Sequence, residues 1–268
     1  MSNIAVVHAP SGLVHATVVR REFVTPHMVR VTFGGADLER FEFRGFDQWF
    51  RLAVPTHAGG DRFDNLPERF GVGGYLRYLT TPSGTRPVIR NYTARFFRPD
   101  VAELDVDFVV HGTEGVAGPW AAAVEPGTPG AEVAFIDQGC GWKPVPHDEV
   151  LLVADESGLP AAAGILRDLP RDARGHAVIE LFDLADVQQT DAPAGVEVHW
   201  VVRDPAAAPG TAALPALADL DLAERTYAFA VGESAVATGA RRHLVNERGM
   251  PKQNITFCGY WKLGRAAG

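Results

Sequence analysis

The sequence has few lysines, and its charge balance excludes one class of partner. Of its 25 basic residues only three are lysines, and 33 acidic residues bring the formal net charge to −8. Nucleic acid as the main partner is excluded, because its phosphate backbone calls for a basic surface. Any anionic ligand must therefore be held by a local group of arginines and lysines that works against the overall charge.

Cysteines and long apolar runs are also scarce. Cys140 and Cys258 are too few and too far apart for a disulfide framework or a cysteine metal site, and we expect them to be reduced and at least half-buried. No run approaches the roughly 18 apolar residues of a membrane helix. The first residues lack the basic and apolar segments of a secretion signal, so we expect a cytoplasmic protein without a membrane span.

The two halves of the chain carry different patterns. With 268 residues, 46% of them hydrophobic and 22% charged, the chain is long enough for two globular domains. Short alternating segments with turns between them predict a small antiparallel barrel or sandwich in the first half. These strands are expected at residues 13–23, 29–33, 49–54, 88–97, 103–110 and 132–136.

The second half begins with a continuous apolar run at residues 150–154, which is typical of a strand buried on both faces. Strands and helices then alternate, a pattern that predicts a parallel sheet with helices on both faces. The Pro-rich segment 143–147 separates the two patterns. We therefore predict an antiparallel β-barrel domain over residues 1–143 and an α/β domain over residues 148–268.

The segment from Arg90 to Arg95 carries the first candidate ligand site. It reads Arg-Asn-Tyr-Thr-Ala-Arg inside a predicted strand, so Arg90 and Tyr92 share one face while Thr93 and Arg95 share the other. A guanidinium pairs with phosphate oxygens, and a phenol ring stacks on a flat heterocycle. These are the needs of a flavin dinucleotide. A strand with a solvated arginine and a core tyrosine has the same sequence, and the pattern alone leaves both interpretations open.

A second candidate site follows His111 and Gly112. Gly118, Pro119 and Trp120 lead into an alanine-rich stretch, which predicts a loop entering a short helix. Such an amino terminus offers free amide donors to a phosphate. The same helix can also close the end of the barrel, and the two roles are compatible.

Four motifs, in this order, resemble those of the siderophore-interacting proteins, a family of flavin-dependent ferric-siderophore reductases related in architecture to ferredoxin–NADP reductase. The resemblance runs from about Thr17 to Arg265. The motifs are Arg90-x-Tyr92-Thr93-x-Arg95, Gly118-Pro119-Trp120-Ala121, Ala154-Asp155-Glu156-Ser157-Gly158-Leu159-Pro160-Ala161 and Gly259-Tyr260-Trp261-Lys262-x-Gly264.

This resemblance implies a flavin-binding barrel, a nucleotide-binding α/β domain and FAD as the cofactor. It implies NAD(P)H or reduced ferredoxin as the electron donor and a ferric siderophore as the substrate. The residues implied for the cofactor are Arg90, Tyr92, Thr93, Arg95, His111, Gly112, Gly118, Trp120, Asp155, Glu156, Ser157, Tyr260 and Trp261.

The sequence departs from the family pattern at two motifs. Trp120 follows Pro119 directly, whereas the family usually has several residues between them. Asp155 and Glu156 stand where a nicotinamide dinucleotide fold usually has glycines, and we expect these carboxylates to repel a pyrophosphate. The phosphates of a nicotinamide donor would then need Arg203, Arg241 or Arg242, although the last two are also typical of a solvated helix face.

The few basic residues near the predicted hinge and carboxyl terminus suggest where a ferric chelate docks. Lys143, Lys262 and Arg265 form a candidate cationic rim for an anionic siderophore, although an exposed lysine and a loose tail are equally consistent with the pattern. Three functions stay open at this point: a ferric-siderophore reductase, a general flavin reductase or electron-transfer protein, and a siderophore carrier without turnover.

Overall fold

A computed structural model describes residues 2–7, 11–56, 63, 66–67, 72–82, 85–110 and 115–264, without the side chains of residues 72, 75 and 77. Its chain contacts divide the protein into two units: Val6–Cys140, and Met1–Ala5 together with Gly141–Gly268. Within the described residues, no helix has the length and apolar character needed to cross a membrane. Cys140 and Cys258 are free thiols in half-buried positions, as expected from the sequence.

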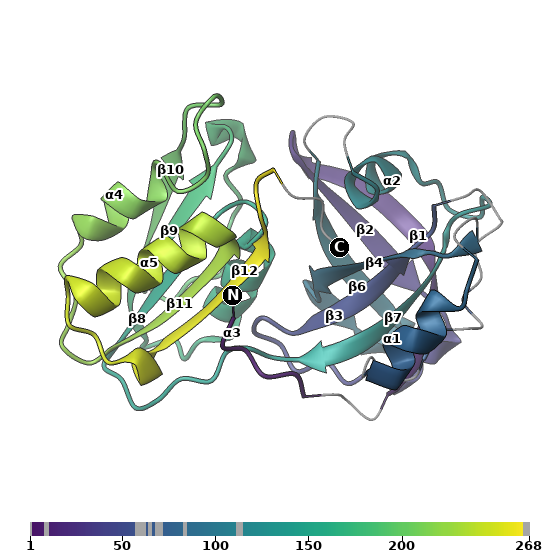
Figure 1. Ribbon diagram of the computed structural model, residues 1–268, viewed down its shortest axis with the longest axis horizontal. Helices are drawn as coiled ribbons and strands as arrows, with labels where there is room; N and C mark the ends of the chain where they lie inside the picture. Colours follow the sequence, from purple (N-terminus) through teal and green to yellow (C-terminus); the bar gives the residue numbers. More distant parts are fainter. Residues whose placement is uncertain are drawn as a thin grey trace. The chain divides into compact units, whose positions relative to one another are not determined.

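The first unit is an antiparallel barrel (Figure 1). Its sheet order is β4-β3-β7-β1-β2-β6-β5, and all its strand pairs are antiparallel. Contacts between β4 and β6 bring the two edges together. The elements are β1 (Leu13–Thr25), β2 (Met28–Gly34), η1 (Ala36–Arg40), β3 (Trp49–Val54), α1 (Val72–Leu79), β4 (Val88–Thr93), β5 (Phe96–Arg98), η3 (Pro99–Val101), β6 (Glu103–Val109), α2 (Ala117–Ala123) and β7 (Glu132–Gly139).

The barrel interior is filled by aromatic and branched side chains from alternate strand positions. Phe33, Phe50, Phe108 and Phe135 are fully buried, and the rings of Phe50 and Phe135 lie 4.7 Å apart. Alternation with period two places these side chains on one face of each strand. The aromatic residues of the predicted strands therefore make up the centre of the core.

The single strand expected at residues 88–97 is wrong. The segment forms two strands on opposite edges of the sheet, β4 beside β3 and β5 beside β6. Between them, Ala94 N donates to Gln48 O at 2.8 Å and Arg95 N donates to Asp105 O at 2.9 Å. The chain thus changes its hydrogen-bonding partner at Ala94 and Arg95 and joins the two edges of the barrel.

The second unit is a parallel sheet with the order β10-β9-β8-β11-β12. Helices α4 and α5 cover one face, where Leu217, Val236 and Leu244 pack with Leu151 and Val153 of β8. The predicted fold class, a barrel followed by a parallel α/β unit, is confirmed. The elements are β8 (Glu149–Ala154), α3 (Leu159–Asp168), β9 (Arg174–Leu181), η4 (Leu184–Asp186), β10 (Gly195–Val202), α4 (Ala213–Ala218), β11 (Thr226–Glu233), α5 (Ser234–Asn246), η5 (Lys252–Asn254) and β12 (Ile255–Trp261).

Candidate functional site

Arg90 and Tyr92 lie on the inward face of β4. Pairing with β3 sets Arg90 opposite Leu52 and Tyr92 opposite Phe50, both of which are fully buried. Directly paired residues in an antiparallel ladder point to the same face, so the two side chains share the core-facing side of the barrel wall. The predicted shared face of Arg90 and Tyr92 is therefore present.

The Tyr92 ring is half-buried against Phe108, with the two ring centroids 4.2 Å apart. Burial raises the pKa of the Tyr92 phenol above its ordinary value, and the charge of Arg90 opposes this shift only in part. The phenol is therefore neutral under physiological conditions. Thr93 lies on the opposite face of β4, is buried, and is paired with Trp49.

Arg90 has no carboxylate partner among the residues that the structure describes. One of its guanidinium nitrogens donates to its own neighbour, Ile89 O, at 2.8 Å. By contrast, Arg30 makes two hydrogen bonds to Asp107, at 2.7 and 2.8 Å, and Arg98 binds Asp105 at 2.6 and 2.7 Å. A half-buried cation without a counter-ion is a place where an anionic ligand gains affinity.

Arg95 lies beyond the end of β4 and belongs to the opposite edge of the barrel. Its Nε is 3.5 Å from an oxygen of Asp107, and its guanidinium lies 4.2 Å from the centre of the Phe96 ring. Only 4% of the residue is exposed. Arg95 therefore lies in the barrel wall beside Asp107, which Arg30 already binds, and its grouping with Thr93 on one strand face is wrong because β4 ends at Thr93.

Helix α2 closes one end of the barrel through Trp120. The indole Nε1 donates to Gly130 O at 3.0 Å, and the ring packs edge-on to Phe108 with a centroid separation of 5.6 Å. At Gly118 a Cβ atom would lie 3.0 Å from Val109 O, so glycine permits this close approach to β6. The plug interpretation of this helix is supported, while His111 and Gly112 lie outside the described residues.

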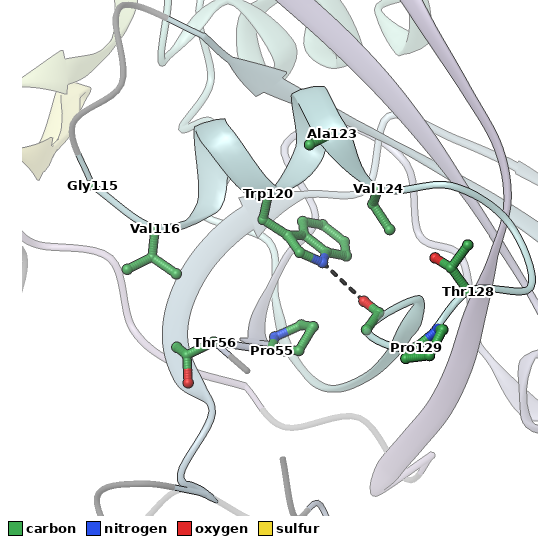
Figure 2. A pocket seen from close by; sticks show the side chains of 10 residues that line it. Pro55, Thr56, Gly115, Val116, Trp120, Ala123, Val124, Thr128 and Pro129 are labelled. Carbon is green, nitrogen blue, oxygen red and sulfur yellow. Dashed lines mark hydrogen bonds between the residues drawn. The ribbon is translucent and has the colours of Figure 1, made fainter. Parts of the chain in front are cut away.

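A hollow of about 460 Å³ lies beside Trp120 and opens to solvent. Figure 2 shows the indole against one side of it, with Pro55 and Thr56 at the end of β3 facing it. The hollow has the size and mainly apolar lining of a small-ligand site. Its walls are Pro55, Thr56, Gly115, Val116, Trp120, Ala123, Val124, Thr128, Pro129 and Gly130.

The hollow, Arg90 and Tyr92 follow one another along the β3–β4 pair. The register pairs Val54 with Val88, so Pro55 continues β3 at the end where β4 begins. At about 3.4 Å per residue, the distance from this end of the pair to Tyr92 is roughly 17 Å. An apolar hollow, a cation without a carboxylate partner among the described residues, and an aromatic ring therefore follow in this order along the barrel wall.

In the α/β unit, Asp155 is fully buried just after β8 and holds the following turn together. Its Oδ1 accepts hydrogen bonds from Ser157 N at 2.9 Å, Ser157 Oγ at 2.6 Å and Gly158 N at 3.1 Å. Its Oδ2 accepts from Glu233 N at 2.6 Å and Trp261 Nε1 at 3.1 Å. Burial raises the pKa of the Asp155 carboxyl, and these hydrogen bonds oppose the shift.

Gly232 is the residue that lets Asp155 reach the β11 backbone. A Cβ atom at this position would lie 2.4 Å from Asp155 Oδ1, and its φ of +123° is unfavourable for other residues. Sequence reasoning missed Gly232 and Glu233, although a Gly-Glu pair directly after a buried strand marked the same sheet edge. The carboxyl end of β11 and the turn after β8 are therefore one hydrogen-bonded unit.

Glu156 pairs with Arg203 inside the α/β unit. Arg203 Nη1 lies 2.9 Å from Glu156 Oε2, its Nη2 also bonds Glu156, and Nη1 is 3.3 Å from Glu180. Burial raises the pKa of Glu156, although the hydrogen bond from Arg203 opposes it. Glu180 accepts three further bonds from the backbone amides of Gly210, Ala212 and Ala213.

This arrangement corrects two expectations about the electron donor. Asp155 and Glu156 are 0% and 3% exposed, so they do not present bare carboxylates to a pyrophosphate. Arg203 is 5% exposed and bound to two glutamates, so it is not available to phosphates. Arg241 lies over the Phe257 ring at 4.9 Å, whereas Arg242 is exposed on α5.

The remaining predicted residues lie near the end of β12 or at the start of the second unit. Trp261 is tied to Asp155, its carbonyl accepts a hydrogen bond from Ser234 Oγ at 2.8 Å, and Tyr260 is half-buried. Lys143 and Lys262 are both exposed, and Arg265 lies outside the described residues. The roles of these residues toward flavin or chelate stay predictions.

Comparisons with known proteins agree with this geometry. The model of the siderophore-interacting FAD-binding domain matches residues 17–137, and that of the siderophore-interacting protein matches residues 147–264. The ferric vibriobactin reductase ViuB of Vibrio cholerae is 32% identical over 92% of this chain and 88% of its own length.

Solved structures give the same result. The crystal structure of a siderophore utilization protein from T. fusca superposes with a TM-score of 0.79 at 32% identity, covering 98% of this chain and 97% of that one. The ferredoxin reductase in carbazole 1,9a-dioxygenase shares the fold alone, with a TM-score of 0.65 at 15% identity over 93% of this chain and 69% of that one. The chain therefore belongs to the siderophore-interacting protein family, and its barrel carries the FAD-binding domain of that family.

Proposed function

We propose that this protein is a flavin-dependent reductase of ferric siderophores that releases iron as Fe(II) in the cytoplasm. The family membership and the likeness to a ferric vibriobactin reductase support a reductase. The observation that carries the proposal is Arg90, a half-buried cation without a carboxylate partner among the described residues, on the same strand face as Tyr92. Such a pair is suited to binding a phosphate and a flat ring.

The residues of the barrel bind and orient the cofactor. Arg90 binds a phosphate of FAD, neutral Tyr92 provides a ring face and the hollow beside Trp120 accepts the adenine. Thr93, Gly118 and the His111–Gly112 pair are further proposed cofactor residues. When bound, the flavin accepts two electrons at once and passes them on singly, which suits a one-electron acceptor such as Fe(III).

The electron donor is a separate part of the proposal. The amides of the turn after β8 already bind Asp155, and Arg203 is bound to Glu156 and Glu180. Both observations favour reduced ferredoxin over a nicotinamide dinucleotide held at this turn. Stopped-flow measurement of flavin reduction by NADH, NADPH and reduced ferredoxin ranks the three donors by rate. Fast reduction by NADPH alone would contradict the preference for ferredoxin.

We propose that Lys143 and Lys262 attract anionic ferric chelates, and Arg265 is a further proposed residue for the same role. Both lysines are exposed, and a local positive charge offsets the net charge of −8. The Lys143→Ala/Lys262→Ala variant should raise the half-saturating concentration of a tris-catecholate complex at low salt and affect a neutral hydroxamate complex less. Unchanged saturation by the anionic complex would exclude these lysines from docking.

The central experiment is anaerobic reoxidation of the flavin. The holoprotein is reduced without oxygen, mixed with a ferric siderophore and followed through the flavin absorption near 450 nm, with Fe(II) trapped by a colorimetric chelator. Two electrons reduce two ferric ions, so we expect about two Fe(II) per flavin. The gallium(III) complex of the same siderophore is the control, because it has the same charge and shape and does not accept an electron.

Each outcome distinguishes one function from the others. Recovery of the flavin colour with the ferric complex and not with the gallium complex supports the reductase. Recovery of the flavin colour when free flavin is added, and not when the ferric complex is added, indicates a general flavin reductase. Binding of both complexes without any recovery of colour indicates a carrier and contradicts the proposal.

A further inference from the structure

Two histidines and two glutamates meet at the amino-terminal end of the parallel sheet. The register pairs His176 of β9 with Glu197 of β10, and His199 lies two residues further along β10 on the same face. Glu149 begins β8, two residues before the partner of His176, and shares that face. These four residues lie at the opposite end of β8 from Asp155, about 20 Å away for six strand residues.

The two imidazoles already have the separation of ligands on one metal ion. His176 Nδ1 lies 3.1 Å from His199 Nε2. Two nitrogens bound at about 2.0–2.1 Å in tetrahedral or octahedral geometry lie about 2.9–3.4 Å apart. The Glu197 carboxylate stands beside both rings, with one oxygen 4.0 Å from His176 Nδ1 and the other 3.8 Å from His199 Nδ1.

Glu149 places a carboxylate beside the outer ring nitrogen of His176, where metal-binding histidines usually have a hydrogen-bond partner. Its Oε1 lies 3.4 Å from His176 Nε2, the ring nitrogen that points away from His199. Its Oε2 accepts a hydrogen bond from Ala223 N at 2.7 Å, and its side chain is only 12% exposed. A carboxylate in this position is suited to accept a proton held on His176 Nε2, the tautomer in which Nδ1 can coordinate a metal.

We propose that His176 Nδ1, His199 Nε2 and a carboxylate oxygen of Glu197 bind a divalent first-row transition cation. Two imidazoles and a carboxylate suit Zn²⁺, Co²⁺ or Fe²⁺, whereas Ca²⁺ and Mg²⁺ prefer oxygen ligands alone. The Glu197 side chain is 69% exposed and the histidines are about one quarter exposed, so water completes the coordination. The site is independent of the flavin and of the proposed reductase activity.

The test is direct metal binding by the full-length holoprotein after treatment with a chelator. Cobalt(II) is titrated and followed through its visible ligand-field absorption, and Zn²⁺ is titrated by calorimetry. We expect one ion per chain at this site. His176→Gln and His199→Gln should each weaken binding at least about tenfold, and Glu149→Gln should weaken it about 10- to 100-fold through the orientation of His176.

A matched control comes from helix α5. His243 lies 3.0 Å from Glu247 on the surface, so it pairs with a carboxylate, and within the described part of the chain it belongs to no group of metal-binding side chains. His243→Gln should leave the cobalt spectrum and the Zn²⁺ affinity unchanged. Circular dichroism confirms that each variant is folded, and Glu197→Gln on the exposed edge strand provides a further test if His176→Gln does not fold.

Two results would overturn the proposal. One is the absence of Co²⁺ and Zn²⁺ binding at concentrations up to about 1 mM. A dissociation constant of that size corresponds to a binding free energy of roughly −4 kcal/mol. The other is binding that both histidine variants leave unchanged, which would assign the ion to another part of the chain. In either case the cluster is held only by the hydrogen bond between His176 and His199, with Glu149 and Glu197 beside the two rings.

Discussion

Arg90 in the barrel and Arg203 in the α/β unit have the same chemistry in different surroundings. Arg203 is 5% exposed and shared between Glu156 and Glu180. Arg90 is half-buried, and among the described residues it bonds only to the carbonyl of Ile89. The Arg203 charge is neutralised inside the protein, whereas no carboxylate among the described residues neutralises the Arg90 charge. The type of side chain near a predicted site therefore does not establish its role, and its partners do.

The buried carboxylates of the α/β unit are also bound by groups of the same unit. Asp155 receives five hydrogen bonds, and Glu156 is neutralised by Arg203. Both carboxylates organise the end of the parallel sheet. We therefore expect Arg203 variants to change stability without changing flavin affinity, and Arg90 variants to do the reverse.

The largest expected effect is that of Arg203→Ala. Removing this cation leaves two glutamates buried without their counter-ion, which should lower the free energy of unfolding by about 3–5 kcal/mol. Urea unfolding of the flavin-free protein, followed by circular dichroism, measures the loss. Flavin affinity should change less than about twofold, or 0.4 kcal/mol. A loss of stability below about 1 kcal/mol would show that Glu156 and Glu180 find other partners.

A smaller effect is expected for Asp155→Asn. The side-chain amide would turn an N–H group toward donors such as Glu233 N and Trp261 Nε1, at a cost of about 1–3 kcal/mol. The matched control is Asp204→Asn, because exposed Asp204 accepts just one side-chain hydrogen bond from the described residues, from the amide of Ala206 at 2.8 Å. We expect a change within about 0.5 kcal/mol there. If urea unfolding gave equal losses of stability for the two variants, Asp155 would not be the residue that holds the turn together.

The smallest effect is that of Arg98→Ala, and it depends on pH. Burial favours a raised pKa for Asp105, but hydrogen bonds from Arg98 and Thr32 and the charges of Arg98 and Arg30 bring it below the ordinary value. A lowered folded-state pKa stabilises the protein above the unfolded-state pKa of about 3.9 and loses that contribution in acid.

Because Arg98 is partly exposed, we expect Arg98→Ala to cost about 1 kcal/mol at pH 7. This difference from the unchanged protein should shrink as the pH falls below about 4. Urea unfolding at pH 7, 5 and 3.5 measures it. A difference that stays constant over this range would show that Arg98 acts by packing and not by its charge on Asp105.

The sequence was sufficient for the features that depend on hydrophobic patterning. The apolar run before Asp155 predicted a buried parallel strand, and β8 is fully buried from Val150 to Ala154. The predicted shared face of Arg90 and Tyr92 followed from strand alternation alone and is present. The alternation of side chains along one strand is a local property, so it can be predicted without knowing which strands lie beside it.

Features that depend on neighbouring strands could not be predicted. The apolar segment around Arg95 reads as one strand because nothing in its pattern marks the crossing from β4 to β5. Helix α1 is also not indicated by its own sequence, because Gly73 and Gly74 each disfavour a helix by about 1 kcal/mol. The partners of Arg203 come from the turn after β8 and from β9, and no spacing in the sequence identifies them.

The most direct test of the account is the affinity of the flavin-free protein for FAD and for riboflavin, with and without Arg90. Riboflavin has the same ring and no phosphate. If Arg90 binds the phosphate, Arg90→Ala should weaken FAD about 10- to 100-fold, or roughly 1.5–3 kcal/mol, and leave riboflavin within about twofold. Equal weakening of both ligands, or no weakening of FAD, would contradict the account.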